Sequence, residues 1–279
     1  MKSKEFIIVA IILLLAFAGI TFTKNWKKTE SNSSSSKAAN SDSIQIFWTN
    51  YNQATQYRLH NVSDSSIIAY EAALTLSPNH NDALYYIGNM YMKVGQIDKA
   101  QKSWEKLIEL NPRGERAFSQ LGTLYFCVTN PEYFHPGKAK SYFERAYDLN
   151  KEALNPNFHL GEIALFQDRI KDAITIFDKL SHMEQKNMEI NFIMGYLNWK
   201  SGHELGAIKD LERAFEQKKA GISVENISME ENQECDLFLN WLNNNLTQAG
   251  KYDIRVVMPD VYQKFDLYLI TMRKQLNAD

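Results

Sequence analysis

A small residue recurs along the chain at a nearly constant interval, and this recurrence constrains the fold more than any other feature. Ala54, Gly88, Gly122, Gly161 and Gly195 follow one another at spacings of 34, 34, 39 and 34 residues. A second small residue, then a large apolar residue four positions later and a further apolar residue three after that, follow in every unit. These are Ser66, Tyr70 and Ala73; Ala100, Trp104 and Leu107; Ala139, Phe143 and Ala146; Ala173, Phe177 and Leu180; and Ala207, Leu211 and Ala214. Apolar spacings of three and four predict helices, and the fixed period predicts repeated helix pairs.

The segment GNMYMKVGQ, residues 88–96, shows why glycines occur at fixed places in these units. Glycine inside a helix costs about 1 kcal/mol relative to alanine, so Gly88 requires a structural reason. We predict that Gly88 is a point where two helices of a pair touch. Gly95 and Gly202 are each predicted to end a first helix and begin the turn to the second.

These units resemble the tetratricopeptide repeat family, most clearly in the segment LYYIGNMYMKVGQIDKAQKSWEKLIELNP. Departures from the family pattern are Ala54 in place of glycine and Ala164 and Asn198 in place of tyrosine. The resemblance implies an all-α fold, a right-handed helical solenoid of stacked helix pairs, over residues 44–220. Its units are expected at about 47–80, 81–114, 115–153, 154–187 and 188–220.

Residues 221–279 are predicted to form a C-terminal helical cap, since a solenoid of such units needs its ends covered. Phe238, Trp241, Leu242 and Leu246 have helical spacing. A last helix is expected from Pro259, with Val261, Phe265, Tyr268, Met272 and Leu276 on one stripe. Both segments are expected to pack against the solenoid, and a sixth, degenerate unit is an alternative description of them.

The N-terminal residues 1–28 are predicted to be a membrane anchor. The uncharged run at residues 6–22 would span about 26 Å as a helix, close to the apolar thickness of a bilayer. A cleaved signal peptide is the alternative, because Ala16-Phe17-Ala18 resembles a processing site. Lysines flank both sides, so orientation rests on the short N-terminal tail, which favours placing the repeat domain outside the cytoplasm. Residues 29–43 read as a serine-rich flexible linker.

In the resembling family, the first helix of each pair lines a concave groove that binds a peptide or a helix. The resemblance therefore implies a partner-binding groove lined by Tyr51, Arg58, Tyr85, Asn89, Lys93, Arg116, Phe126, Phe158, Phe192, Tyr196 and Trp199. Its aromatic residues would offer large contact areas with polar edges to an apolar or amphipathic segment. The alternative is that several of these rings pack internally or beneath the C-terminal helices.

Composition and motifs exclude several classes of function. The net charge is -2 and no basic face is evident, which argues against nucleic-acid binding. Neither phosphate-binding loops nor nucleophile elbows occur, and the histidines show no ligand spacing, so we expect no enzyme activity, no metal, no cofactor and no small-molecule substrate.

Cys127 and Cys235 are either separate buried thiols or a pair in an oxidising compartment. The five extra residues between Cys127 and Lys140 read as a surface insertion or a contact loop.

The predicted function is that of a membrane-tethered, chaperone-like scaffold that binds a protein partner or peptide segment through this groove. Its layout resembles bacterial envelope proteins of the same superfamily, which implies a single-pass protein of the inner membrane with the repeat domain on the periplasmic side. The alternative is a structural subunit of a stable membrane complex, with the groove permanently occupied.

Overall fold

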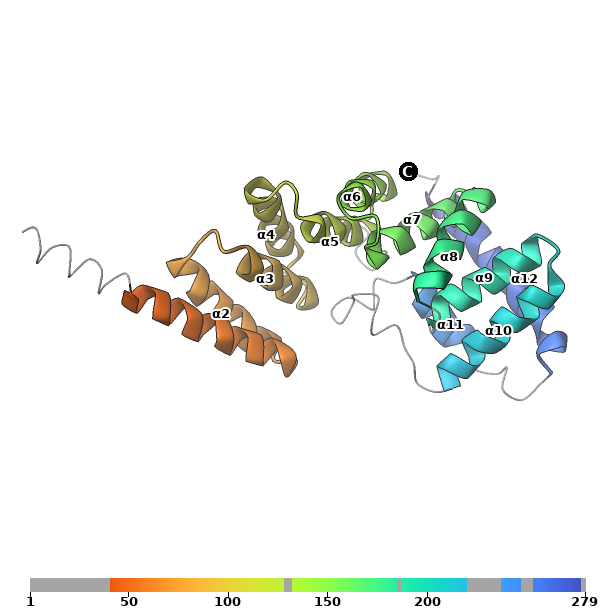
Figure 1. Cartoon of the computed structure of the whole chain (residues 1–279), viewed down its shortest axis with the longest axis horizontal. Helices are drawn as coiled ribbons and strands as arrows, with labels where there is room; N and C mark the ends of the chain where they lie inside the picture. The colour runs from red at the N-terminus through yellow and green to blue at the C-terminus, as the bar shows by residue number, and fades with distance from the viewer. Residues whose placement is uncertain (1–40, 128–131, 185–186, 220–236, 247–252, 277–279) are drawn as a thin grey trace, which may run out of the picture. The chain divides into compact units, whose positions relative to one another are not determined.

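The computed structural model describes residues 41–127, 132–184, 187–219, 237–246 and 253–276, which are helices joined by short turns, with no strand among them (Figure 1). Compact packing divides the chain into two units, Met1–Pro78 and Asn79–Asp279. The architecture is an all-helical repeat fold, as the sequence predicts. The C-terminal helices α11 and α12 belong to the same compact unit as the helices from α3 to α10.

In the first unit, helical residues 41–59 pair with α2, Ser63–Leu76. Ser66 Oγ donates a hydrogen bond to the Ala54 carbonyl at 2.9 Å, and both residues are fully buried. The two small residues of this unit therefore meet where the helices cross. A larger side chain at either position would separate the helices.

Residues 41–43, which we expected in the flexible linker, are helical. The expected linker boundary at residue 43 is therefore wrong. Ile44, Phe47 and Tyr51 have helical spacing, and extending an existing helix costs far less than starting one. This helix consequently continues into the polar residues that precede the apolar stripe.

The second unit holds most of the repeat. Its helices are α3 Asn81–Lys93, α4 Ile97–Leu110, α5 Glu115–Phe126, α6 Pro136–Leu149, α7 Leu154–Phe166, α8 Ile170–Met183, α9 Met188–Lys200, α10 Glu204–Lys219, α11 Leu237–Asn245 and α12 Ile254–Leu276. Consecutive helices pair as α3 with α4, α5 with α6, α7 with α8 and α9 with α10, and each pair touches the next. In addition, α11 packs against α9, and α12 packs against α7 and α10.

Glycines mark the crossing points of the helix pairs. A Cβ placed on Gly88 would overlap the Trp104 ring of α4. The same atom on Gly122 would lie 2.5 Å from the Phe143 ring, and on Gly161 it would lie 2.6 Å from the Phe177 ring. The prediction that Gly88 is a contact residue is therefore confirmed. Each of these glycines admits a large aromatic side chain from the second helix of its own pair.

In four helix pairs the structure describes a left-handed residue in the turn, seven positions after the small residue. Gly95 and Gly202 have φ values of 74° and 78°, which confirms their predicted turn role. Asn61 and Asp168 occupy the same place in their units, each with a φ of 59°. Asparagine and aspartate are the non-glycine residues that tolerate this conformation best.

The helix α12 begins at Ile254 and contains Pro259 in its second turn. The expectation that the helix starts at Pro259 is wrong. Pro259 lacks the N–H that would bond to the Arg255 carbonyl, so the helix loses one internal hydrogen bond near its start and continues on both sides of it. The irregular stretch expected before Pro259 is helical from Ile254 onward.

Within the ranges that the structure describes, every helix is too short or too polar to cross a membrane. The predicted anchor at residues 6–22 and most of the predicted linker lie outside those ranges.

Candidate functional site

Two predicted groove residues, Tyr85 of α3 and Arg116 of α5, lie against each other. The Arg116 guanidinium carbon is 3.7 Å from the centroid of the Tyr85 ring, a close cation–π contact. Gln120 Nε2, one turn after Arg116, donates a hydrogen bond to the Tyr85 hydroxyl at 3.1 Å. Arg116 also forms a 3.7 Å ion pair with Asp82, and the side chain of Arg116 remains 47% exposed. This arrangement presents an aromatic ring and an exposed ion pair to solvent.

Asn89 lies one turn after Tyr85 on α3 and is only 6% exposed. Its Oδ1 atom accepts no hydrogen bond from any group in the described part of the chain. An unsatisfied buried acceptor costs about 1–3 kcal/mol, and a bound segment reaches this oxygen only after the Asn89 side chain turns toward the surface. Tyr85, Asn89 and Arg116 together are called the α3–α5 face below. Lys93, one further turn along α3, is exposed at the end of the same helix.

Phe126 and Phe158 do not line an open surface. Phe126 is 3% exposed, with ring centroids of Phe166 and His159 at 6.1 and 5.8 Å. Phe158 is 1% exposed and meets the Phe177 ring edge-on at 5.6 Å. Their burial corrects the expectation that these rings face an open groove. Both rings pack internally, which is the alternative that the sequence left open.

Tyr51 and Arg58 belong to the first compact unit. The Tyr51 ring is half-buried and meets the Tyr70 ring edge-on at 5.7 Å. Arg58 is also half-buried. Their role in binding a partner stays a prediction.

The predicted groove residues of α9 are covered by α12. Phe192 and Tyr196 are fully buried, and the Phe265 ring of α12 lies 5.0 and 4.9 Å from theirs, edge-on to both. Trp199, which is half-buried, lies 5.9 Å from the Tyr262 ring of the same helix. The expectation of an open groove here is therefore wrong, because α12 occupies the face of α9 on which these residues lie.

A carboxylate of α12 binds to the same face of α9. Asp266 Oδ1 accepts hydrogen bonds from the Tyr196 hydroxyl at 2.6 Å and from Lys200 Nζ at 2.8 Å. The side chains of Lys200 and Asp266 are 31% and 24% exposed. Hydrogen bonds to an ionised group are stronger than neutral ones, so this pair fixes the register of α12 on α9.

Near its C-terminal end, α12 also binds to the end of α7. Arg273 Nε donates to the Phe166 carbonyl and Arg273 Nη2 to the Leu165 carbonyl, each at 3.0 Å. Arg273 Nη2 also lies 2.8 Å from Asp168 Oδ1 in the turn after α7. The last carbonyls of a helix lack partners within it and carry the negative end of its dipole. The guanidinium of Arg273 therefore supplies a donor to the Phe166 carbonyl, adds a second donor to the Leu165 carbonyl, which also accepts from the Asp168 N–H, and lies at the negative end of the helix dipole.

Gly195 of α9 is covered by Tyr262 of α12. A Cβ on Gly195 would overlap the Tyr262 hydroxyl, which donates to the Ala207 carbonyl at 3.3 Å. The corresponding glycines Gly88, Gly122 and Gly161 are covered by an aromatic residue of their own helix pair. In this unit the residue at that place is Leu211, which is smaller. The helix α12 therefore supplies the group that the repeat itself lacks.

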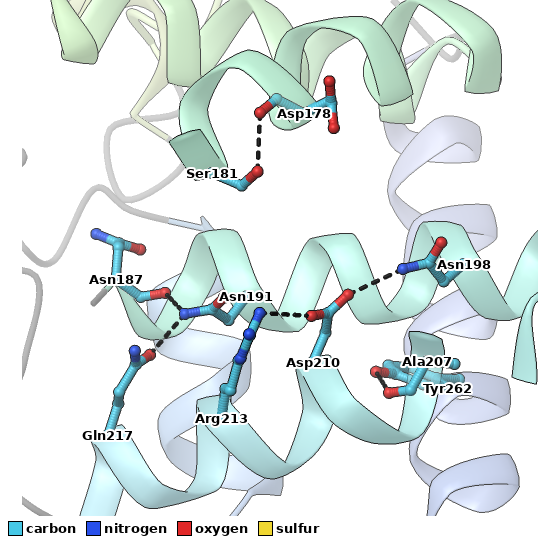
Figure 2. A network of polar contacts seen from close by, with 10 residues as sticks. All are labelled: Asp178, Ser181, Asn187, Asn191, Asn198, Ala207, Asp210, Arg213, Gln217 and Tyr262. Carbon is cyan, nitrogen blue, oxygen red and sulfur yellow. Dashed lines mark hydrogen bonds and ion pairs between the residues drawn. The ribbon is translucent and has the colours of Figure 1, made fainter. Parts of the chain in front are cut away.

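Polar contacts hold α9 and α10 together beside this contact (Figure 2). Asn191 Nδ2 donates to Gln217 Oε1 and Asn198 Nδ2 to Asp210 Oδ2, both at 2.9 Å. Burial raises the pKa of Asp210, although the Asn198 hydrogen bond and nearby cations oppose this. Asn198 occupies the place of the usual tyrosine, so this departure from the family pattern replaces ring packing with a hydrogen bond across the pair.

The charge of Asp266 makes α12 docking sensitive to acid. Burial alone would raise the pKa of Asp266, but hydrogen bonds from Lys200 and Tyr196 and the charges of Lys200 and Arg273 hold it below its ordinary value. A carboxylate with a lowered pKa stabilises the folded state when ionised, and this stabilisation is lost as pH falls through the lowered pKa. We therefore expect α12 docking to weaken only below about pH 4.

Tryptophan fluorescence measured from neutral pH into this acid range checks the prediction, because Trp241 lies 4.9 Å from the Phe265 ring and Trp199 also faces α12. The Asp266→Asn variant should lose the acid-dependent step assigned to this carboxylate. An identical step in wild type and in this variant would contradict the assignment.

Sequence reasoning missed Tyr262, Asp266 and Arg273 as contact residues. The stripe through Phe265 indicated which face of the last helix is apolar. The smaller Leu211 indicated that another residue must cover Gly195, and this residue is Tyr262. Leu211 is the non-aromatic residue in the series Tyr70, Trp104, Phe143, Phe177 and Leu211. Asp266 and Arg273 had no signal, because charged residues on a helix are ordinarily solvated.

No group of three or more histidine, cysteine or acidic side chains that could hold a metal ion occurs within the described ranges. Cys127 is fully buried and disulfide-bonded, so it is not a free nucleophile. The other cysteine of the chain, Cys235, lies outside the described residues.

Residues 81–113, which contain the α3–α4 pair, match the family model for the tetratricopeptide repeat. Among curated proteins, the chain is 27% identical over 147 residues to the BBSome complex member BBS4 of Mus musculus, covering 53% of this chain and 27% of that protein. It is 24% identical over 170 residues to the anaphase-promoting complex subunit CDC16 of Saccharomyces cerevisiae, covering 58% and 20%. The chain thus spans about a quarter of the length of these relatives.

Among solved structures, the chain resembles MamA of Desulfovibrio magneticus RS-1 with a TM-score of 0.51 and 13% identity. The match covers 63% of this chain and 96% of that one. A likeness at this identity concerns the fold alone.

Proposed function

We propose, from the premise that this chain is a tetratricopeptide repeat protein, that it is a non-enzymatic scaffold whose α3–α5 face binds a segment of a partner protein. The observation that carries the proposal is the contrast between two parts of the predicted groove. On α9 the predicted residues are covered by α12. On α3 and α5, Arg116 is half exposed above Tyr85, and a buried oxygen of Asn89 lacks a donor.

The chemistry of this face favours a segment with both donors and acceptors. Arg116, which pairs with Asp82, and Lys93 offer cationic donors, Asn89 offers an acceptor once its side chain turns outward, and Tyr85 offers an aromatic surface with a polar edge. An extended peptide supplies N–H groups, carbonyls and side chains at once. The names of the two curated relatives, a complex subunit and a complex member, support a role in protein assemblies.

We further propose that the scaffold is tethered to a membrane by residues 6–22, with the repeat domain on the extracytoplasmic side. The uncharged N-terminal run supports the tether. The disulfide bond of Cys127 supports placement of the repeat domain on the extracytoplasmic side of the membrane, because stable disulfides occur chiefly in oxidising compartments. Assembly, secretion or maturation of envelope proteins is the process that this placement favours.

Thiol labelling checks the compartment. We expect no thiol of Cys127 to react with an alkylating reagent in denatured chain taken from its native cells, and full reaction after reduction. Mass spectrometry of the digested chain reads both states. Quantitative labelling of Cys127 without reductant, in cells lysed under alkylation, would contradict the proposed placement.

The partner-binding role is tested by crosslinking in native membranes. We expect Tyr85→Ala and Arg116→Ala to reduce the capture of crosslinked partners about tenfold each, since a central aromatic or arginine contact is commonly worth about 1–2 kcal/mol or more. Identification of the captured proteins by mass spectrometry, with quantification relative to the chain, gives the readout.

Arg113→Ala is the matched control, because Arg113 is an exposed arginine in the turn just before α5. It removes the same charge from the same region without touching Tyr85. Circular dichroism should be unchanged in all three variants. Equal capture by wild type, Tyr85→Ala and Arg116→Ala would refute the α3–α5 face as a binding surface.

The alternative function, a structural subunit of a stable membrane complex, is favoured by one observation in the first unit. Ile44, Trp48 and Ile68 there are 51%, 47% and 67% exposed, and a permanent neighbour would cover such apolar side chains. The two functions differ in behaviour. Aggregation of the chain expressed alone, relieved by co-expression of a neighbour, would favour the structural subunit, whereas a monodisperse chain that captures partners reversibly would favour the scaffold.

A further inference from the structure

The face of α9 under α12 binds a specific set of aromatic and acidic groups. Three consecutive contacts of α12 define it: the Tyr262 hydroxyl over Gly195, the Phe265 ring against Phe192 and Tyr196, and the Asp266 carboxylate bound by Tyr196 and Lys200. Tyr262, Phe265 and Asp266 stand at positions i, i+3 and i+4, so one face of a helix presents all three. This face of α9, called the α9 groove below, therefore recognises an amphipathic helix with two aromatic residues and a carboxylate.

The helix α12 does not fill all the space beside it. A cavity of about 550 Å³ remains where the end of α12 meets α5 and α7. Its apolar walls include Phe126, Ile163 and Phe166, and Arg273 of α12 lines it. Gln167 and Asp168 line it as well, and it is half open to solvent. A helix with a longer amphipathic side chain at this end would cover polar and apolar walls that α12 leaves in contact with water.

The outer face of α12 is mostly polar, with Arg255, Asp260 and Lys264 exposed, but it also carries exposed apolar side chains. Val256 and Leu267 are 73% and 63% exposed. The last helix of a solenoid ordinarily turns a polar face to water. The specific contacts of α12 with the α9 groove include the partly exposed pair of Lys200 and Asp266, which water can reach.

We propose that α12 is a displaceable internal ligand, and that an amphipathic helix of a partner protein, with tyrosine, phenylalanine and aspartate at i, i+3 and i+4, takes its place in the α9 groove. This proposal rests on the scaffold function proposed above and adds a second, regulated site to it. Exchange of one helix for another conserves the buried ring contacts and the bound carboxylate, so the solenoid remains covered. The partner helix can add contacts in the half-open pocket that α12 leaves beside Arg273.

Displacement by an external helix must overcome the tether of α12, whose effective concentration is on the order of millimolar. A ligand with no advantage over α12 therefore binds weakly to the wild-type chain. Weakening α12 while leaving the groove intact exposes the site. Asp266→Asn in the chain does this, because it removes the carboxylate of α12 and retains Tyr196 and Lys200 of the groove.

The probe is a fluorescently labelled synthetic peptide with the sequence of residues 254–276, added to the full chain. We expect it to bind the Asp266→Asn chain about tenfold more tightly than the wild-type chain, since a hydrogen-bonded charge contributes about that factor or more. Asp260→Asn is the matched control, because Asp260 lies on the same helix, is exposed and pairs with Lys264. The control chain should bind the peptide as wild type does.

A peptide that carries Asp266→Asn itself should lose the gain in affinity for the Asp266→Asn chain. Peptide binding that is absent from all chains, or equal in the Asp266→Asn and Asp260→Asn chains, would overturn the proposal and leave α12 as a permanent cap. This failure is distinct from failure of the scaffold function, because partner capture at the α3–α5 face is measured with Tyr85→Ala and Arg116→Ala.

Hydrogen exchange of the wild-type chain provides a second measurement that needs no variant. We expect the α12 amides to exchange faster than those of α9, and to exchange faster still when the unlabelled peptide is added. If the α12 amides exchange hydrogen only at the rate of the α9 and α10 amides, then α12 leaves the groove only when the repeat unfolds. This result would also overturn the proposal.

Discussion

Replacing Phe265 with alanine is expected to lower the free energy of unfolding of the second unit by about 3–5 kcal/mol. Phe265 is fully buried and lies about 5 Å, between ring centroids, from Phe192, Tyr196 and Trp241. Its removal leaves a cavity at the centre of this aromatic cluster and loosens α12 from the α9 groove. Chemical denaturation followed by circular dichroism and by tryptophan fluorescence measures both effects.

Leu267→Ala is the control for this prediction, since Leu267 lies two residues further along α12 and is 63% exposed. An exposed substitution of this kind ordinarily changes stability by about 0.5 kcal/mol or less. A Phe265→Ala loss below about 1 kcal/mol, or one equal to that of Leu267→Ala, would show that α12 contributes little to the folded unit.

Replacing Gly122 with alanine is expected to destabilise the second unit by about 1–3 kcal/mol or more. The added Cβ would lie 2.5 Å from the buried Phe143 ring, so either α5 or α6 must shift. Alanine gains up to about 1 kcal/mol in helix propensity over glycine, and the clash must exceed this gain for the variant to be less stable. The midpoint of denaturation, at unchanged slope, gives the difference.

Gly137→Ala is the matched control in the same helix pair. An added Cβ at Gly137 in α6 would meet no atom within 4 Å. This substitution should be neutral or slightly stabilising. Equal stability of the Gly122→Ala and Gly137→Ala chains would contradict the close helix crossing that defines the repeat.

The helical architecture could be predicted because the same spacing of small and apolar residues recurs in five units. Gly88 has a counterpart in Gly122, 34 residues later, and Gly95 has one in Gly202, at the same place in the fifth unit. The sequence alone therefore separates a packing role from a turn role. The left-handed Asn61 and Asp168 were missed, since neither residue is glycine. They become recognisable only once the turn position is known.

The candidate site could be predicted in part. Tyr85 and Arg116 lie together on adjacent first helices, as the phase of the repeat indicates. The same phase placed Phe192 and Tyr196 in an open groove and could not reveal that α12 covers them. Contacts between α9 and α12 join residues about 70 positions apart, such as Tyr196 and Asp266, and no periodic pattern specifies such a pairing.

In the structure α12 occupies the α9 groove, and we propose that the α3–α5 face binds a partner. A photo-crosslinking amino acid placed at Tyr85 in one chain and at Tyr196 in another tests both halves in native membranes, with mass spectrometry of the products. We expect the probe at position 85 to link the chain to another protein, and the probe at position 196 to link chiefly to α12 of the same chain. Crosslinks to other proteins from position 196 alone, with none from position 85, would contradict this account.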